Sequence, residues 1–283
     1  MRALSSQHSV CVLCRVLRVS RSTYYKSLNR EPSSTDAEKV MIRTRILEIY
    51  SRADKRMGVR KITTCLKRDY CICVSEGRVY RLMKTMALPK MSTVKPPKPV
   101  YAPSDDSECK NLLKQRFDQP APNMVWVCDF TYIKVAERFC YVCAIVDLFS
   151  RKVIAYKVSF HIDRFLAIDT LREAVSSRAA KKGVIFHTDR GSQFTSKDFR
   201  MTADTLGIIQ SFSAKGHPYD NAVMECFFKY LKKEETDRRS YSGINELRIS
   251  LFKYIVGYYN SYRPHSHNSS LSPNEREDIF FNK

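Results

Sequence analysis

The chain has 283 residues, enough for two domains of ordinary size, because domains usually span about 100 to 200 residues. Hydrophobic residues make up 43% of it and charged residues 28%, a balance that excludes a wholly disordered chain. Its 49 Lys and Arg against 29 Asp and Glu give a net charge of +20, which indicates a polyanionic partner. The first 100 residues carry +15 of this charge, from 22 basic and 7 acidic side chains. On charge alone, a merely solvated basic surface is the alternative.

No stretch approaches the roughly 18 consecutive apolar residues of a membrane span, and the N-terminus lacks the order of a signal peptide. We therefore expect a cytoplasmic protein with no membrane partner. The ten Cys residues are scattered, mostly within apolar strings, which favours reduced core thiols over a disulfide framework. No zinc is expected. Cys11 and Cys14 have no second pair nearby, and Cys140 and Cys143 should point to opposite faces of one strand.

Residues 1–30 have the pattern of a helix-turn-helix segment. Apolar residues recur at helical spacing over residues 10–17, and Ser20 can cap a second helix that begins at Arg21. The second helix of such a unit can enter the major groove of DNA, so Arg21 is a candidate DNA contact. A short helical hairpin that binds nothing is the alternative.

Residues 36–88 predict a helical DNA-binding domain, because the helical period recurs three times there. Ser75 is placed to cap the third helix, which exposes a basic face that includes Arg78 and Arg81. We expect this face to contact DNA phosphates, although solvated side chains are its ordinary explanation. Residues 89–122 are interpreted as a linker, rich in Pro and Lys over residues 89–108.

Residues 123–283 are expected to form an α/β domain with a helical C-terminal extension. Three successive strands, read as antiparallel, and two later ones are predicted at 125–133, 139–147, 153–158, 183–187 and 208–211. Helices are predicted at about 165–177, 196–206, 220–235 and 243–262, with Asp220 as the N-cap of the third.

Three carboxylates in this part of the chain have positions that suit chemistry. Asp129 lies inside the first strand, where a charge among apolar residues is costly unless it is paired or binds a metal. Asp189 follows the fourth strand directly, at the start of a loop that contains Gly191. Glu225 lies on a helix. Taken singly, each is more often structural than catalytic.

Together, three carboxylates from two strands and a helix suit Mg²⁺, which prefers oxygen ligands. Two such ions can activate the attacking oxygen and stabilise the leaving oxygen when a phosphodiester is displaced in line. Two further polar side chains lie near these carboxylates in the sequence, and neither is assigned as a metal ligand. His187 lies on the same strand face as Asp189 and is either structural or part of the site, whereas Asp147 is interpreted as a carboxylate that stabilises a turn.

Between Asp189 and Glu225 lie 35 residues, and five strings surround the three carboxylates and the C-terminal part of the chain. These strings are WVCDFTY at 126–132, VDLFSR at 146–151, HTDRGSQF at 187–194, DNA at 220–222 and YNSYRPH at 259–265. In spacing and strings, nearly the whole chain resembles the retroviral-integrase-like DDE transposases, specifically the OrfB-type, second-reading-frame proteins of the insertion-sequence-three family.

The resemblance implies an RNase H-like catalytic core, a mixed five-stranded sheet with flanking helices, behind an all-α helix-turn-helix region. It implies that Asp129, Asp189 and Glu225 are the catalytic metal ligands for Mg²⁺, with Mn²⁺ as a substitute. Lys232, two helical turns after Glu225, is a candidate DNA contact, and a solvated lysine is the alternative. Lys229 and Lys215 are further candidate DNA contacts.

The resemblance also implies partners and a location. The partners are double-stranded DNA, as terminal inverted repeats and target, further copies of the chain in a synaptic complex, and an upstream-frame protein. The location is the bacterial nucleoid. The chain departs from the family at Arg18, where Gly is usual, and at residues 57–60, where Met-Gly-Val-Arg replaces an aromatic-Gly-aromatic string.

We therefore expect a DNA transposase that hydrolyses phosphodiesters and transfers strands at insertion-sequence ends. A non-catalytic DNA-binding regulator of transposition, derived from the truncated downstream frame, is the main alternative. A general RNase H-like nuclease also fits the expected fold, but it leaves the DNA-binding region and residues 263–265 unexplained.

Overall fold

The computed structural model describes residues 5, 8–28, 33–88, 109–214 and 218–282. Most of the predicted linker, residues 89–108, and the candidate Lys215 lie outside these ranges. None of the described helices is both long and apolar enough to cross a membrane.

The N-terminal part is all helical, as predicted. Its helices are α1 (Val10–Val16), α2 (Arg21–Leu28), α3 (Ser34–Arg52), α4 (Val59–Tyr70) and α5 (Glu76–Thr85). Two predicted caps are confirmed, because the Ser20 hydroxyl accepts from the amide of Thr23 at 3.1 Å and that of Ser75 accepts from Arg78 at 3.3 Å. Arg18, in the turn between α1 and α2, has a φ of 51°, in the left-handed region that favours glycine.

The C-terminal part is built on a mixed sheet of five strands, in the order β3-β2-β1-β4-β5. The strands are β1 (Val125–Val135), β2 (Arg138–Asp147), β3 (Val153–Ser159), β4 (Ile185–Thr188) and β5 (Ile209–Phe212). β1, β2 and β3 pair antiparallel, as predicted, whereas β4 runs parallel to both β1 and β5. The expected mixed five-stranded sheet is therefore confirmed.

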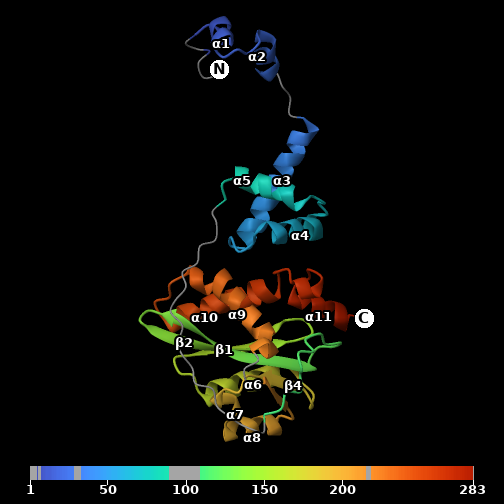
Figure 1. Cartoon of the computed structure of the whole chain (residues 1–283), viewed down its shortest axis with the longest axis vertical. Helices are drawn as coiled ribbons and strands as arrows, with labels where there is room; N and C mark the ends of the chain where they lie inside the picture. The colour runs from blue at the N-terminus through green and yellow to red at the C-terminus, as the bar shows by residue number, and fades with distance from the viewer. Residues whose placement is uncertain (1–4, 6–7, 29–32, 89–108, 215–217, 283) are drawn as a thin grey trace.

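Helices cover both faces of this sheet (Figure 1). One layer consists of α6 (Arg164–Arg178), α7 (Ser192–Thr195) and α8 (Lys197–Thr205). The other consists of α9 (Ala222–Glu234), α10 (Ile244–Phe252), a π-helical continuation over Lys253–Asn260, and α11 (Pro273–Phe281). Strand alternation separates the two cores, since Cys143 packs in the α6–α8 core and Cys140 in the α9–α10 core, on opposite faces as expected.

Two details of the helical layer differ from the sequence-based expectations. Asp220 is not the N-cap of the helix that carries Glu225, because a 3-10 turn over Pro218–Asn221 precedes α9 and Asn221 stands at the cap position. α11 was not predicted, although Ser272 and Glu275 form a capping box around Pro273 that the sequence displays.

The α3–α5 unit rests on the α9–α10 layer. Ile42 and Leu66 of this unit belong to the same apolar cluster as Tyr258 and Tyr262 at the end of the π-helical stretch. The guanidinium of Arg52 lies 4.2 Å from the ring centroid of Tyr262. The helical unit is therefore docked on the helical face of the C-terminal part, not tethered to it by the linker alone.

Candidate active site

The register of β1 and β4 places two of the three predicted carboxylates side by side. The last paired residues of the two parallel strands are Val127 and His187, and Asp129 and Asp189 each follow two residues later. Because residues two apart point to the same face of a strand, Asp129 faces the side that α9 covers, and Asp189, directly after the end of β4, is close enough for its charge to raise the pKa of Asp129. Parallel strands lie about 4.8 Å apart, so this register brings the two carboxylates within interaction distance.

Glu225 comes to the same place on the first turn of α9. That helix lies against β1, and its apolar side packs into the same core as Val127. The Asn221 side-chain amide donates to the backbone carbonyl of Cys128 at 3.1 Å, and this bond attaches the start of α9 to the strand residue before Asp129. A strand, a loop and a helix terminus therefore converge in the middle of the sheet, where β1 and β4 lie side by side.

The electrostatics of the site follow from this crowding of acids. Burial, then the like charge of Asp189 and more weakly of Glu225, raises the pKa of Asp129 from 3.8 to about 8. The amide of Phe130, which donates to Asp129 Oδ1 at 2.7 Å, and the ammonium of Lys232 oppose this rise in pKa. The Asp129 carboxyl therefore keeps its proton at neutral pH, and a cation bound nearby would favour loss of that proton.

Asp189 lies in the loop after β4, where the backbone of Gly191 comes close to its carboxylate. Its Oδ1 accepts from the amide of Gly191 at 2.9 Å, and a Cβ added at Gly191 would stand 3.0 Å from that same oxygen. The absence of a side chain at residue 191 therefore leaves room for the Asp189 carboxylate.

In the ranges that the structure describes, no three His, Cys, Asp or Glu side chains stand close enough together to hold a metal ion as they are. The donor chemistry nevertheless fits a hard divalent cation, because Asp129, Asp189 and Glu225 offer only oxygen ligands. Their mutual repulsion, visible in the raised pKa of Asp129, would be relieved by such an ion. The carboxylates form an open arrangement that an ion could draw together.

His187 and Asp147 are structural. The His187 ring is buried, with Nδ1 2.8 Å from the hydroxyl of Ser211 and Nε2 3.2 Å from that of Ser213, and burial lowers its pKa to about 4. Asp147 is buried and accepts from the amide of Phe149 at 2.8 Å, as expected of a turn-stabilising carboxylate.

The predicted DNA contacts occupy different environments. Lys232 is half-buried near the acids, with its Nζ 4.2 Å from the ring centroid of Tyr132. Lys229, Arg21 and Arg81 are exposed.

Arg78 is engaged within the helical unit. Its two terminal nitrogens lie 3.0 and 2.6 Å from the carboxylate oxygens of Glu38, so α5 is joined to α3 through this side chain. The predicted phosphate contact at this position would compete with an existing ion pair.

Three residues that hold the two ends of α9 were not recognised from their sequence motifs. Asp220 accepts from the side chains of Asn111 and Gln115, both at 2.8 Å, and Asn221 anchors α9 as described above. Arg263, in the 259–265 string, is buried and bonds Glu234 at the end of α9. The strings at 220–222 and 259–265 were the available signal, but a string alone does not say which contact its polar residues make.

Family models match most of the chain. An integrase core domain matches residues 119–218, a second integrase core domain model matches 206–273, and an HTH-like domain matches 36–95. The mixed sheet, its two helical layers and these matches define the class as a protein with an RNase H-like integrase core and an HTH-like domain.

The chain is 34% identical to the transposase of insertion sequence element IS904 from Lactococcus lactis subsp. lactis (strain IL1403), over 88% of its own length and 98% of that protein. It is 32% identical to the transposase InsF of insertion sequence IS3A from Escherichia coli (strain K12), over 96% of its length and 95% of that protein. The chain belongs to the IS3-family transposases.

Similarity to solved structures is weaker. A simian T-cell lymphotropic virus intasome in complex with a PP2A regulatory subunit aligns over 82% of this chain and 74% of that chain, at 15% identity and a TM-score of 0.46. The HTLV-2 integrase catalytic core domain in complex with magnesium aligns over 56% of this chain and 98% of that chain, at 19% identity and a TM-score of 0.41.

Proposed function

We propose that this transposase cleaves phosphodiesters at insertion-sequence ends and transfers the freed strand to target DNA, with Asp129, Asp189 and Glu225 as its catalytic metal ligands. The observation that carries the proposal is the β1–β4 register, which brings Asp189 close to Asp129 on the face covered by the helix of Glu225. Three carboxylates converging over the inner strands β1 and β4 would otherwise be an unrelieved cost in free energy.

The three carboxylates would hold Mg²⁺, with Mn²⁺ as a substitute, and the bound ions would activate the attacking oxygen and stabilise the leaving oxygen. Metal binding would displace to solvent the proton that Asp129 retains because of its raised pKa. Lys232, close enough to Asp129 to oppose the rise in its pKa, is placed to bind a phosphate oxygen of the substrate beside the carboxylates. No side chain need form a covalent bond to DNA.

The partners of this activity would be double-stranded DNA, as terminal inverted repeats and as target, and further copies of the chain in a synaptic complex. An upstream-frame protein is a further partner. We propose that the protein acts in the bacterial cytoplasm, on the nucleoid.

Strand transfer on an element-end duplex, in Mg²⁺ and in Mn²⁺, tests the proposal. Asp189→Asn should abolish both hydrolysis and strand transfer, whereas Asp169→Asn, at an exposed acid on α6, should leave both unchanged. Full activity of D189N would exclude Asp189 as a ligand. DNA binding without cleavage by the unaltered chain, with and without the upstream-frame protein, would favour the non-catalytic regulator instead.

A further inference from the structure

Helix α4 carries two pairs of cations, each pair spaced seven residues apart. Lys61 and Arg68 face the C-terminal part of the chain, where the Lys61 ammonium lies 2.8 Å from Glu234 and the Arg68 guanidinium 3.4 Å from Glu275. Arg60 and Lys67 each precede one of these residues and therefore lie on the neighbouring stripe of the helix. Lys61 and Arg68 thus contact acids of the C-terminal part, and Arg68, which also pairs with Asp69 at 2.5 Å, lines the cleft described next together with Arg60 and Lys67.

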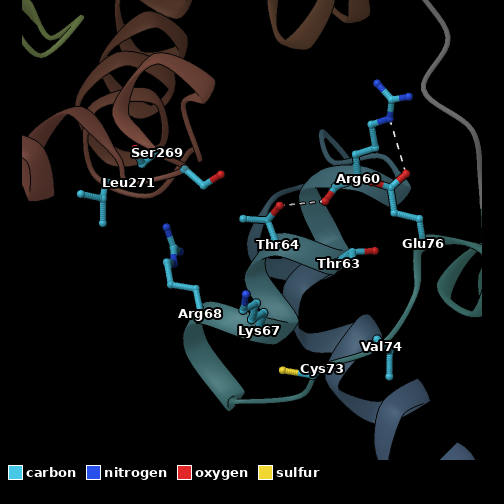
Figure 2. A pocket seen from close by; sticks show the side chains of 11 residues that line it. Arg60, Thr63, Thr64, Lys67, Arg68, Cys73, Val74, Glu76, Ser269 and Leu271 are labelled. Atoms are coloured by element: carbon cyan, nitrogen blue, oxygen red, sulfur yellow. Dashed lines mark hydrogen bonds and ion pairs between the residues drawn. The ribbon is translucent and has the colours of Figure 1, made fainter.

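The second stripe faces a cleft of about 770 Å³ between α4 and the 269–271 loop of the C-terminal part. Figure 2 shows Thr64 and Lys67 on α4, the Arg60 side chain extended toward Glu76, and Arg68 between α4 and Ser269. The hydroxyl of Thr64 donates to the carbonyl of Arg60 at 3.0 Å and can still accept a hydrogen bond. Cations and hydroxyls from two parts of the chain therefore line the same hollow.

The charges of the cleft are incompletely neutralised. Glu76, the one acid among its described lining residues, lies 3.5 Å from Arg60, but the two side chains are 58% and 89% exposed, so the pair is weak. Lys67 is exposed and has no acid within ion-pair distance among the described residues. The cleft is thus built to attract an anion.

The opposite wall is held in a strained shape. Ser269 and Ser270 both lie in the left-handed region, with φ of 53° and 71°, which costs free energy in residues other than glycine. The carbonyl of His265 accepts from the amide of Ser270 at 2.9 Å, and the Asn268 side chain donates to the carbonyl of Ser150 at 2.7 Å. These two bonds hold the loop against residues 150 and 265.

We propose that this cleft binds the phosphodiester backbone of DNA, as a site separate from the three carboxylates. The inference rests on the proposed function, since it assumes that the chain acts on DNA. Arg60 and Lys67 are about 10 Å apart along the helix axis, at about 1.5 Å per residue. With α4 along the duplex axis, that length is about three steps of 3.4 Å, so the two cations would contact two phosphates of one strand that are three steps apart.

Fluorescence anisotropy with a labelled random duplex of about 30 base pairs, titrated between about 50 and 200 mM salt, tests the proposal. Random sequence suffices, because phosphate contacts do not read bases. Arg60→Gln with Lys67→Gln should weaken binding and lower the slope of log affinity against log salt by about 2, since each phosphate contact contributes about 0.9. The charge-preserving pair Arg60→Lys with Lys67→Arg should keep the original slope.

The matched control is Lys181→Gln with Lys182→Gln, which removes two exposed cations from the turn after α6, on the other side of the sheet from α4 (Figure 1). This variant should keep the affinity and the slope. Circular dichroism melting checks folding, and if the double variant were unstable, Lys67→Gln alone should lower the slope by about 1.

Binding by the R60Q/K67Q variant equal to that of the unaltered chain would overturn the inference and leave the proposed catalysis intact. Conversely, the R60Q/K67Q variant could show the reduced salt dependence while the D189N variant stayed active. That result would support DNA binding in the cleft and reject the proposed carboxylate site. The two proposals therefore fail separately.

Discussion

Arg263 and Glu234 form a buried bidentate ion pair, in which Nε and Nη2 of the arginine lie 2.8 and 2.9 Å from the two carboxylate oxygens. The same carboxylate accepts from Lys61 at 2.8 Å and from the hydroxyl of Tyr254 at 3.0 Å. Because Glu234 ends α9 and Lys61 lies on α4, one side chain joins the helix of Glu225, the 259–265 string and the docked helical unit. The pair lies at the opposite end of α9 from the candidate site.

Arg263→Leu should lower the free energy of unfolding by about 3–5 kcal/mol, because it leaves the buried Glu234 carboxylate without its main partner. Lys61 would compensate for part of this loss. Chemical denaturation monitored by circular dichroism measures the change. The matched control is Arg60→Leu, whose pair with Glu76 is exposed and should contribute less than about 1 kcal/mol. Equal losses in the two variants would contradict the assigned role of the buried pair.

Asp129→Asn should stabilise the metal-free protein in a pH-dependent way. The pKa of Asp129 is raised from 3.8 in its ordinary state to about 8 in the folded chain, so between these values the unfolded chain releases a proton that the folded chain keeps. Raising the pH through this window therefore lowers stability, and the full cost is present above pH 8. The substitution should raise the free energy of unfolding by at least about 1.4 kcal/mol above pH 8, the equivalent of one pKa unit, and by little near pH 4. Melting curves at several pH values, in chelator, measure it, and a pH-independent gain would contradict the assigned cause.

Divalent metal should have the opposite effect on the unaltered chain. Mg²⁺ or Mn²⁺ competes with the proton that Asp129 retains, so its stabilisation of the fold should grow as the pH rises from 6 to about 8. Differential scanning fluorimetry with and without metal measures this trend. Asp189→Asn should remove most of the metal-dependent shift, whereas Asp169→Asn should not alter it. An identical metal-dependent shift in D189N would argue that the ion binds elsewhere.

Arg18→Gly should stabilise the turn between α1 and α2 by up to about 1 kcal/mol, because it removes the Cβ that makes a φ of 51° costly. The gain is limited by the greater freedom of glycine in the unfolded chain. Slower amide exchange at Val19, whose amide donates to the carbonyl of Cys14 at 3.0 Å, would report the effect. Arg18→Ala keeps the Cβ and should leave the exchange rate unchanged. A matching effect in both variants would trace the gain to the lost charge instead.

Residue patterns predicted the elements of this fold well because periodicity reports burial directly. β1 was predicted at 125–133 and spans 125–135, its residues pack into two cores, and its antiparallel pairing with β2 was predicted from the short polar turn that joins the two strands. The family identity also followed from residues. The spacing of Asp189 and Glu225 and the five strings indicate an IS3-family transposase, which the 34% identity to the IS904 transposase confirms.

Contacts between distant segments could not be predicted in the same way. Asp220 has the residue type of an N-cap, yet it accepts from Asn111 and Gln115, which lie more than 100 positions earlier in the chain. The ion pair of Arg78 with Glu38 likewise depends on how α3 and α5 pack, so a face that the sequence marks as basic is in part neutralised. The cleft beside α4 could not be predicted either, because it forms only where α4 and the 269–271 loop come together in the folded chain.

Asn221→Ala should uncouple the start of α9 from β1. The substitution removes the 3.1 Å bond to the carbonyl of Cys128 and should cost about 1–3 kcal/mol, because that carbonyl is buried beside the site. Glu225 lies one turn further along α9, so a small shift of the helix start displaces its carboxylate relative to Asp129. Misplacement of a metal ligand should lower the strand-transfer rate at least tenfold at a temperature where the variant is folded. Asn274→Ala, on α11, is the matched control and should leave the rate unchanged. Full activity in N221A would show that Glu225 is positioned by packing of α9 alone.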